Sequence, residues 1–199
     1  MLQEQTNDSG YSGENRVCPW QHVRTFDNLL RPLIHNPRKL FGLYVRPGMT
    51  VLDAGCGAGF ASLGLARLVG NGGVVIAADL QPEMLRMVTQ RAAKAGLGHR
   101  IRTHRCQADR IGVQDRLDFA VAFWMVHEVP DRRAFLQEVL DLLKPGGHLF
   151  IAEPKLHTSD PEFEQTIREA QELGFRVSKR PGVRFSRAVL LQKELGQSA

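Results

Sequence analysis

Short apolar runs alternate with amphipathic stretches along most of the chain, and this order predicts the secondary structure. In chain order we expect strand 50–54, helix 60–69, strand 74–79, helix 82–95, strand 100–106, strand 118–123, helix 131–143, strand 148–153, helix 161–173, strand 174–180 and strand 185–192. Alternating strands and helices indicate an α/β, doubly wound fold with helices on both faces of the sheet. The sheet should have seven strands that are mostly parallel, with an antiparallel C-terminal strand.

The N-terminal region does not follow this alternation. Residues 1–16 are polar and predict a disordered tail. Residues 17–40 predict a short helical cap, because apolar residues recur at helical spacing between Phe26 and Ile34, with Pro32 and Pro37 interrupting. A chain of 199 residues fits a single domain over 17–199. The cap is not needed by the core, so we expect it to close over an acceptor site or to cover helix faces.

A glycine-rich turn connects the first strand to the first helix of the core. The strand ends in Asp53, and Gly55, Gly57 and Gly59 lead into the helix. Glycine allows tight turns and close approach of a ligand to the backbone. The free N–H groups and dipole at the helix start favour a carboxylate or phosphate. This combination predicts a nucleotide-binding corner.

Two further residues narrow the chemical class of the expected ligand. Phe60 stands where the dinucleotide fingerprint needs a small residue for close packing of helix and strand. Asp79 closes the second strand, twenty residues after Gly59, a separation at which an acid can accept from ribose hydroxyls. The residues therefore indicate a ligand with a ribose and without a pyrophosphate.

At this point the chain resembles the class I S-adenosylmethionine-dependent methyltransferases, whose first motif is an acid followed by G-x-G-x-G and whose second is an acid closing the next strand. The strand Leu117–Phe123 with the following Val126–Asp131, and the segment Leu142–Ile151 with its Pro-Gly-Gly turn, resemble the ubiquinone/menaquinone-biosynthesis type of small-molecule methyltransferase. The resemblance covers roughly residues 40 to 155. It implies a Rossmann-like fold and S-adenosyl-L-methionine as cofactor.

The resemblance also assigns cofactor residues. Asp53 is expected near the methionine end and Asp79 at the ribose. The third strand departs from the family, because Gln107 stands where an acid often meets the adenine amino group; a shift by one bulge would bring Asp109 there instead. The residues expected to bind the cofactor are Asp53, Gly55, Gly57, Asp79, Leu80, Gln107, Ala108 and Phe123.

His127 is the candidate general base, with Glu128 beside it, because both follow the fourth strand at the edge where ligands bind in doubly wound sheets. In-line methyl transfer can proceed by positioning alone, so the base is optional. The alternative is a histidine that only bonds backbone in its loop. Glu153 and His157 share the same rim, but none of these residues has metal-ligand spacing, and we expect no metal.

The formal charge of +5 permits an acidic partner such as nucleic acid, but the basic clusters have almost no aromatic residues between them. The fourth strand is not followed by the Asn/Asp-Pro-Pro motif of base-methylating enzymes, and the chain has no Pro-Cys nucleophile. We therefore expect a small-molecule acceptor. The alternatives are an RNA or protein methyltransferase, or a non-catalytic regulatory subunit that binds S-adenosylmethionine.

Three cysteines without paired spacing indicate a reducing compartment. No run of 18 apolar residues occurs, and the N-terminus has no apolar signal core, so we expect a cytoplasmic protein without a membrane span. The sequence leaves the oligomeric state open.

Overall fold

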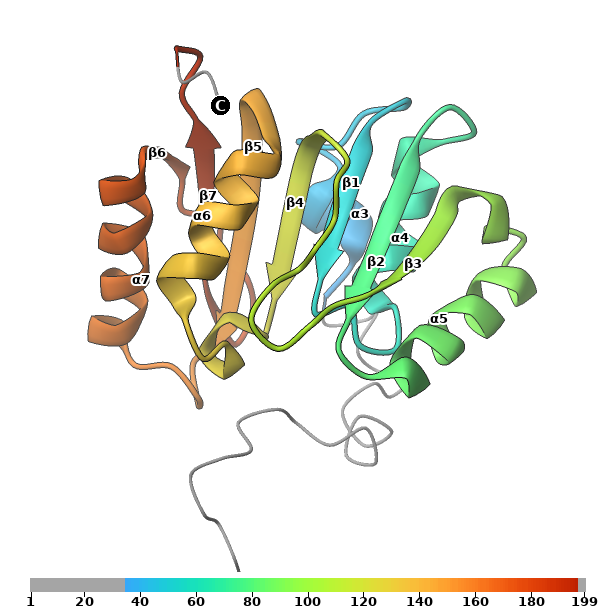
Figure 1. Cartoon of the computed structure of the whole chain (residues 1–199), viewed down its shortest axis with the longest axis horizontal. Helices are drawn as coiled ribbons and strands as arrows, with labels where there is room; N and C mark the ends of the chain where they lie inside the picture. Colours follow the sequence, from blue (N-terminus) through green and yellow to red (C-terminus); the bar gives the residue numbers. More distant parts are fainter. Residues whose placement is uncertain (1–34, 197–199) are drawn as a thin grey trace, which may run out of the picture.

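The computed structural model describes residues 35–196. A seven-stranded sheet of order β3-β2-β1-β4-β5-β7-β6 forms its centre (Figure 1). The elements are α3 (Pro37–Phe41), β1 (Thr50–Ala54), α4 (Phe60–Val69), β2 (Val74–Asp79), α5 (Pro82–Lys94), η1 (Gly98–Arg100), β3 (Ile101–Arg105), β4 (Leu117–Phe123), η2 (Val126–Glu128), α6 (Arg132–Leu142), β5 (Leu143–Pro154), α7 (Asp160–Leu173), β6 (Phe175–Lys179) and β7 (Ser186–Lys193).

The sheet is parallel from β3 to β5. Strand β7 pairs antiparallel with both β5 and β6, so it is the strand that runs against the others. The predicted doubly wound, mostly parallel sheet with an antiparallel C-terminal strand is thereby confirmed. Strand order reverses between β1 and β4, and in such folds ligands bind beyond the carboxyl ends of the strands at this point.

Alternation along the strands divides the core between the two faces of the sheet. On one face Leu52 and Ile76 pack with α6, α7 and the loop between β3 and β4; on the other Val51 and Val75 pack with α3 and α4. In Figure 1 the long loop crosses in front of the sheet while α3 and α4 lie behind it. These strands are apolar on both sides, as expected for a parallel sheet covered by helices on both faces.

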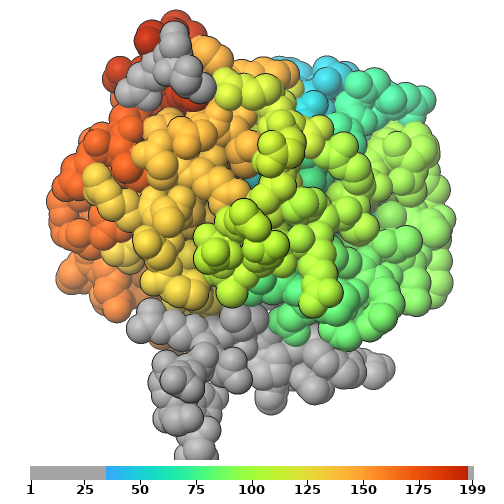
Figure 2. Space-filling view, viewed as in Figure 1, coloured from blue at the N-terminus to red at the C-terminus, as the bar shows by residue number. Residues whose placement is uncertain are grey.

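The loop between β3 and β4 takes the place of a crossover helix. The Glu138 carboxylate on α6 accepts hydrogen bonds from the N–H groups of Ile111 and Gly112 at 2.8 and 2.7 Å. These bonds satisfy backbone donors that would otherwise be unpaired in a loop. The loop spreads over the surface beside α6, as the space-filling view shows (Figure 2).

The end of the predicted cap differs from expectation. Pro37 does not interrupt a helix but begins α3, with the Asn36 side chain accepting from the N–H groups of Arg38 and Lys39. Proline suits the first position of a helix because the N–H that it lacks would have no helical partner there. Phe41 is fully buried, with its ring 5.3 Å from that of Phe150. Leu40, the last residue of the predicted cap, packs against the same cluster, so the end of the cap is part of the core.

The predicted tail over 1–16 and the cap residues 17–34 lie outside the described residues. Within residues 35–196, no helix is both long enough and apolar enough to cross a membrane.

Candidate functional site

Two loops meet where the strand order reverses, one after β1 and one after β4. The first holds Gly55 and Gly57, and the second runs through Trp124 to η2. A Cβ built on Gly55 would lie only 2.8 Å from the Cβ of Met125. A side chain at this position would therefore push the two loops apart, and glycine allows their contact.

The glycine loop has the backbone geometry that its sequence predicts. Gly55, Gly57 and Gly59 have φ angles of +62°, +52° and +89°, in the region that disfavours residues with a Cβ. A Cβ on Gly59 would lie 3.0 Å from the side chain of Val88 on α5. A Cβ on Gly57 would meet nothing within 4 Å, so the space next to the loop is open at this residue.

Asp79 connects the glycine loop to the start of α5. Its carboxylate accepts from the N–H of Gly57 and from the N–H of Gln81, both at 2.9 Å. Burial raises the pKa of Asp79, and the backbone donors only partly offset this effect. The side chain is 8% exposed, so the acid stands in a dry position at the end of β2. A carboxylate can accept further hydrogen bonds there, as a ribose hydroxyl pair would require.

Asp53 is the more deeply buried of the two predicted acids, at 1% exposure. Its carboxylate accepts a hydrogen bond of 2.5 Å from the hydroxyl of Ser62 in the first turn of α4. This bond ties the end of β1 to the helix that follows the glycine loop. The role of Asp53 at the methionine end of a cofactor stays a prediction.

The predicted adenine side is the most exposed part of the candidate site. Leu80 is half-buried, whereas Gln107, Ala108 and Asp109 are exposed. The Gln107 side-chain oxygen accepts from the Arg110 guanidinium at 2.9 Å within a short turn. The backbone is nevertheless tied to β2, because the N–H of Cys106 donates to the carbonyl of Asp79 at 3.0 Å. Contact of Gln107 and Ala108 with adenine stays a prediction, and the alternative at Asp109 stays open.

Trp124 begins the loop after β4 in an unusual backbone conformation, with φ of +64°. Its N–H donates to the carbonyl of Ala152 at 2.7 Å, and its indole N–H donates to the Ser186 hydroxyl at 2.8 Å. A positive φ is uncommon for a residue with a Cβ and persists where the surroundings fix it. Here hydrogen bonds to two neighbouring strands fix both the backbone and the ring.

The predicted residue Phe123 is buried in an aromatic cluster at the end of β4. The His35 ring lies edge-on to the Phe123 ring at 5.4 Å and to the Trp124 ring at 5.3 Å. Its Nε2 is 2.8 Å from the carbonyl oxygen of Arg184. The described end of the predicted cap thus contacts the loop after β4.

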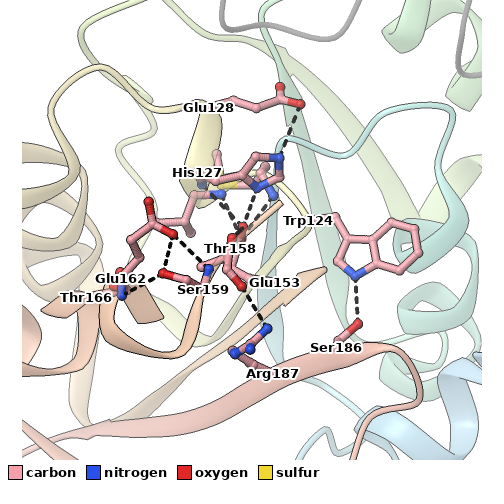
Figure 3. A network of polar contacts seen from close by, with 12 residues as sticks. Trp124, His127, Glu128, Glu153, Thr158, Ser159, Glu162, Thr166, Ser186 and Arg187 are labelled. Atoms are coloured by element: carbon pink, nitrogen blue, oxygen red, sulfur yellow. Dashed lines mark hydrogen bonds and ion pairs between the residues drawn. The ribbon is translucent and has the colours of Figure 1, made fainter. Parts of the chain in front are cut away.

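Glu153, at the end of β5, organises the rest of this loop (Figure 3). One carboxylate oxygen accepts from the N–H groups of Met125 and Val126 at 3.2 and 2.9 Å. The other accepts from the N–H of His127 at 3.3 Å and from the Thr158 hydroxyl at 3.4 Å, and it also bonds His127 Nδ1. The side chain is 2% exposed. It therefore binds the predicted base through both backbone and ring.

The surroundings of His127 favour its protonated form. Burial lowers the pKa of His127, but the hydrogen bond to Glu153 and the charges of Glu153 and Glu128 outweigh that effect and raise it. Nε2 lies 3.8 Å from a Glu128 carboxylate oxygen, and the His157 ring stacks at 5.7 Å. The structure thus brings together His127, Glu128, Glu153 and His157, the four residues that the sequence places on one rim.

The sequence did not reveal that Glu153 bonds His127. The available signal is its position, because Glu153, Asp53 and Asp79 each lie within the last two residues of a strand. Among residues 35–196 no group of three or more His, Cys, Asp or Glu side chains is arranged to hold a metal ion.

Comparison with known proteins shows the family to which the chain belongs. Residues 46–193 match the family model described as a methyltransferase domain. The ubiquinone biosynthesis O-methyltransferase of Xanthomonas euvesicatoria is 33% identical over 105 residues, 53% of this chain and 43% of that protein. The ubiquinone/menaquinone biosynthesis C-methyltransferase of Cronobacter sakazakii is 29% identical over 139 residues, 69% of this chain and 54% of that protein. The chain spans about half the length of these curated relatives.

Solved structures agree with the family model. A SAM-dependent methyltransferase from Aquifex aeolicus superposes with a TM-score of 0.79 at 27% identity, over 88% of this chain and 99% of that one. A structure from Methanococcus maripaludis, described as a putative S-adenosyl-L-methionine-dependent methyltransferase, has a TM-score of 0.75 at 17% identity and supports the fold alone. The resemblance predicted from the motifs is confirmed, and the chain belongs to the methyltransferase-domain family.

Proposed function

We propose that this protein transfers a methyl group from S-adenosylmethionine to a small-molecule acceptor, with His127 accepting a proton from that acceptor. The observation that carries the proposal is the contact between the two loops: the glycine loop that would hold the cofactor touches Met125, two residues before His127. Cofactor and candidate base thus belong to one site. Such proximity and orientation are the main contributions that an enzyme can make to an in-line displacement.

The residues present fit the proposed cofactor. Gly57 leaves open space beside the start of α4, and the dry carboxylate of Asp79 lies next to it, bonded to the Gly57 N–H. When bound there, S-adenosylmethionine supplies a methyl group on a positively charged sulfur, which a nucleophile can attack. Asp53, Gly55 and Gly57 would hold its methionine end and Asp79 and Leu80 its nucleoside.

His127 is suited to take a proton. Its Nδ1 bonds Glu153, which leaves Nε2 as the nitrogen that can take a proton from the methyl acceptor. A carboxylate oxygen of Glu128 lies 3.8 Å from Nε2. A histidine in its neutral form is an effective base near neutral pH. The negative charges of Glu153 and Glu128 favour the protonated ring that results.

A small-molecule acceptor is favoured over nucleic acid by the pairing of two of the basic side chains with acids. In the cluster between residues 176 and 187, Arg180 bonds Glu164 at 2.5 and 2.8 Å, and Arg187 pairs with Asp160. Paired guanidinium groups are less available for phosphates than free ones. The names of the matched relatives in ubiquinone biosynthesis also support a small acceptor.

Two measurements test the proposal. Calorimetry should show binding of S-adenosylmethionine and of its demethylated product to the full chain, and not of NAD. Turnover should then be followed with phenolic small molecules, total RNA and a protein extract as acceptors. Methylation of RNA or protein alone would replace the small-molecule acceptor, and binding without turnover of any acceptor would favour a regulatory subunit.

A further inference from the structure

We infer that Glu153 is a positioning residue that fixes the tautomer of His127. It holds the proton of the neutral ring on Nδ1, so that Nε2 can take a proton from the small molecule that receives the methyl group. This inference rests on the proposed role of His127. It assigns to a residue at the end of β5 a function that acts through the ring of another residue.

Five groups around the Glu153 carboxylate can act as hydrogen-bond donors to it. They are the N–H groups of residues 125–127, the Thr158 hydroxyl and His127 Nδ1. The backbone donors cannot reverse their role, so both carboxylate oxygens serve as acceptors. The oxygen that faces Nδ1 already accepts from the N–H of His127 and from the Thr158 hydroxyl, so Nδ1 supplies the proton of the bond between ring and carboxylate. Neutral His127 then has its lone pair on Nε2.

The same contacts orient the ring as well as its proton. The backbone at His127 and the ring of His127 bond the same carboxylate, so the side chain cannot rotate without breaking a hydrogen bond to a buried charge. Leaving a buried charge with fewer partners is costly. Thr158 adds a further donor from the loop after β5. Glu153 thus limits both the direction of Nε2 and its protonation.

Among residues 35–196, the charged and titratable groups that face His127 come from three segments. Glu128 lies on η2 beside Nε2, Glu153 lies on β5 beside Nδ1, and His157 stacks on the ring from the loop after β5. Of these, Glu153 bonds Nδ1. Its removal should therefore change the tautomer, whereas removal of Glu128 should change only the electrostatic surroundings of Nε2.

Glu153→Gln separates this role from simple support of the loop. A glutamine oxygen can accept either from the N–H groups of Met125 and Val126 or from the N–H and Nδ1–H of His127, but it cannot serve both sets of donors. In the first orientation the NH₂ group faces His127 Nδ1 and can only donate to it. We expect the variant to move part of the neutral His127 population from the Nδ1–H to the Nε2–H tautomer, in which the base points the wrong way.

The matched control is Glu138→Gln. Glu138 also supports a loop with its carboxylate, by accepting from the N–H groups of Ile111 and Gly112, but it does not bond His127. If Glu153 only supported a loop, the two variants should behave alike. We expect both to lower the melting temperature and only Glu153→Gln to change the ring of His127.

The experiment is ¹⁵N NMR of histidine side chains in the full chain, with His127→Gln to assign the signal. The wild type should show Nδ1–H and an unprotonated Nε2 at high pH, and Glu153→Gln should show an increased share of the Nε2–H tautomer, with a lower pKa for His127. Turnover with a working acceptor should fall by about 10²–10⁴-fold in kcat, with little change in KM for the cofactor.

The inference is overturned if neutral wild-type His127 carries its proton on Nε2, a test that holds even if Glu153→Gln does not fold. It is also overturned if Glu153→Gln folds and leaves the tautomer and the pKa unchanged. Failure of the proposed function gives a different result. The tautomer is then as expected, but His127→Gln keeps full activity, and this refutes the base and with it the catalytic meaning of Glu153.

Discussion

Asp79→Asn should weaken cofactor binding far more than it weakens the fold. The carboxylate of Asp79 is the one predicted to accept from the ribose hydroxyls, and it already accepts from two backbone N–H groups. An amide of the same size keeps one acceptor oxygen and loses the charge. A hydrogen bond to a charged group contributes about 1.5–3 kcal/mol. Its loss should raise the Kd of S-adenosylmethionine by about 10- to 150-fold.

The stability of the cofactor-free protein should respond in another way. Because burial raises the pKa of Asp79 above 3.8, the folded protein holds this proton more tightly than the unfolded chain does. Stability should then fall as the pH rises from about 4 through the folded pKa, since the charged form is buried at a cost. Asp79→Asn removes this component. The loss of one neutral backbone bond, about 0.5–1.5 kcal/mol, is partly offset at neutral pH by the relief of that cost.

Calorimetry with S-adenosylmethionine and its demethylated product, and thermal unfolding without ligand, measure the two effects. Asp118→Asn is the matched control, because the Asp118 carboxylate also accepts from a backbone N–H, that of Thr50 at 2.8 Å, and from Lys144 at 2.7 Å. Asp118 lies at the start of β4, far along the strand from the site. This variant should lower stability and leave binding unchanged. If Asp79→Asn binds the cofactor like the wild type, the assignment of the ribose site to β2 is wrong.

Gly57→Ala and Gly55→Ala should separate the space for a ligand from the packing of the loops, since both incur about 1–2 kcal/mol of left-handed strain but only Gly55→Ala adds a close contact with Met125. Calorimetry should find the larger loss of cofactor affinity in Gly57→Ala, and unfolding should find the larger loss of stability in Gly55→Ala. His127→Gln should lower kcat by about 10²–10⁴-fold. The wild-type rate should rise with pH, with its midpoint above pH 6.5, and the stability that protonated His127 contributes should be lost over the same pH range. A flat pH–rate profile would contradict a histidine base. Phe41→Ala should cost about 3–5 kcal/mol of unfolding free energy, and the exposed neighbour Leu43→Ala about 0.5 kcal/mol or less, so equal melting temperatures would show that α3 is not part of the core.

Most of the fold could be predicted because its signals are local. The bounds of β1, α4 and β2 coincide with the ranges predicted from apolar runs and the glycine turn. Strand β5 is the main departure, since it begins at Leu143 instead of residue 148. Leu143 pairs with Leu117 across a register shift, and this pairing extends the strand backwards through the Pro-Gly-Gly turn. Turn residues conceal such an extension in the sequence, because it depends on the partner strand.

The site could be predicted only in part for the same reason. Asp53 and Asp79 lie in a local pattern, and their separation along the chain carries information. The bond between His127 and Glu153 joins residues 26 positions apart, and it requires the register of β4 against β5. Phe123 pairs with Ala152, so the next residue of β5, Glu153, lies beside the loop that leaves β4. A shift of one residue would turn the Glu153 side chain to the other face of the sheet and leave the N–H groups of residues 125–127 without their acceptor. The parallel register therefore determines whether His127 has a carboxylate beside Nδ1, and the proposed role of His127 as a base depends on this register more than on any residue within the loop.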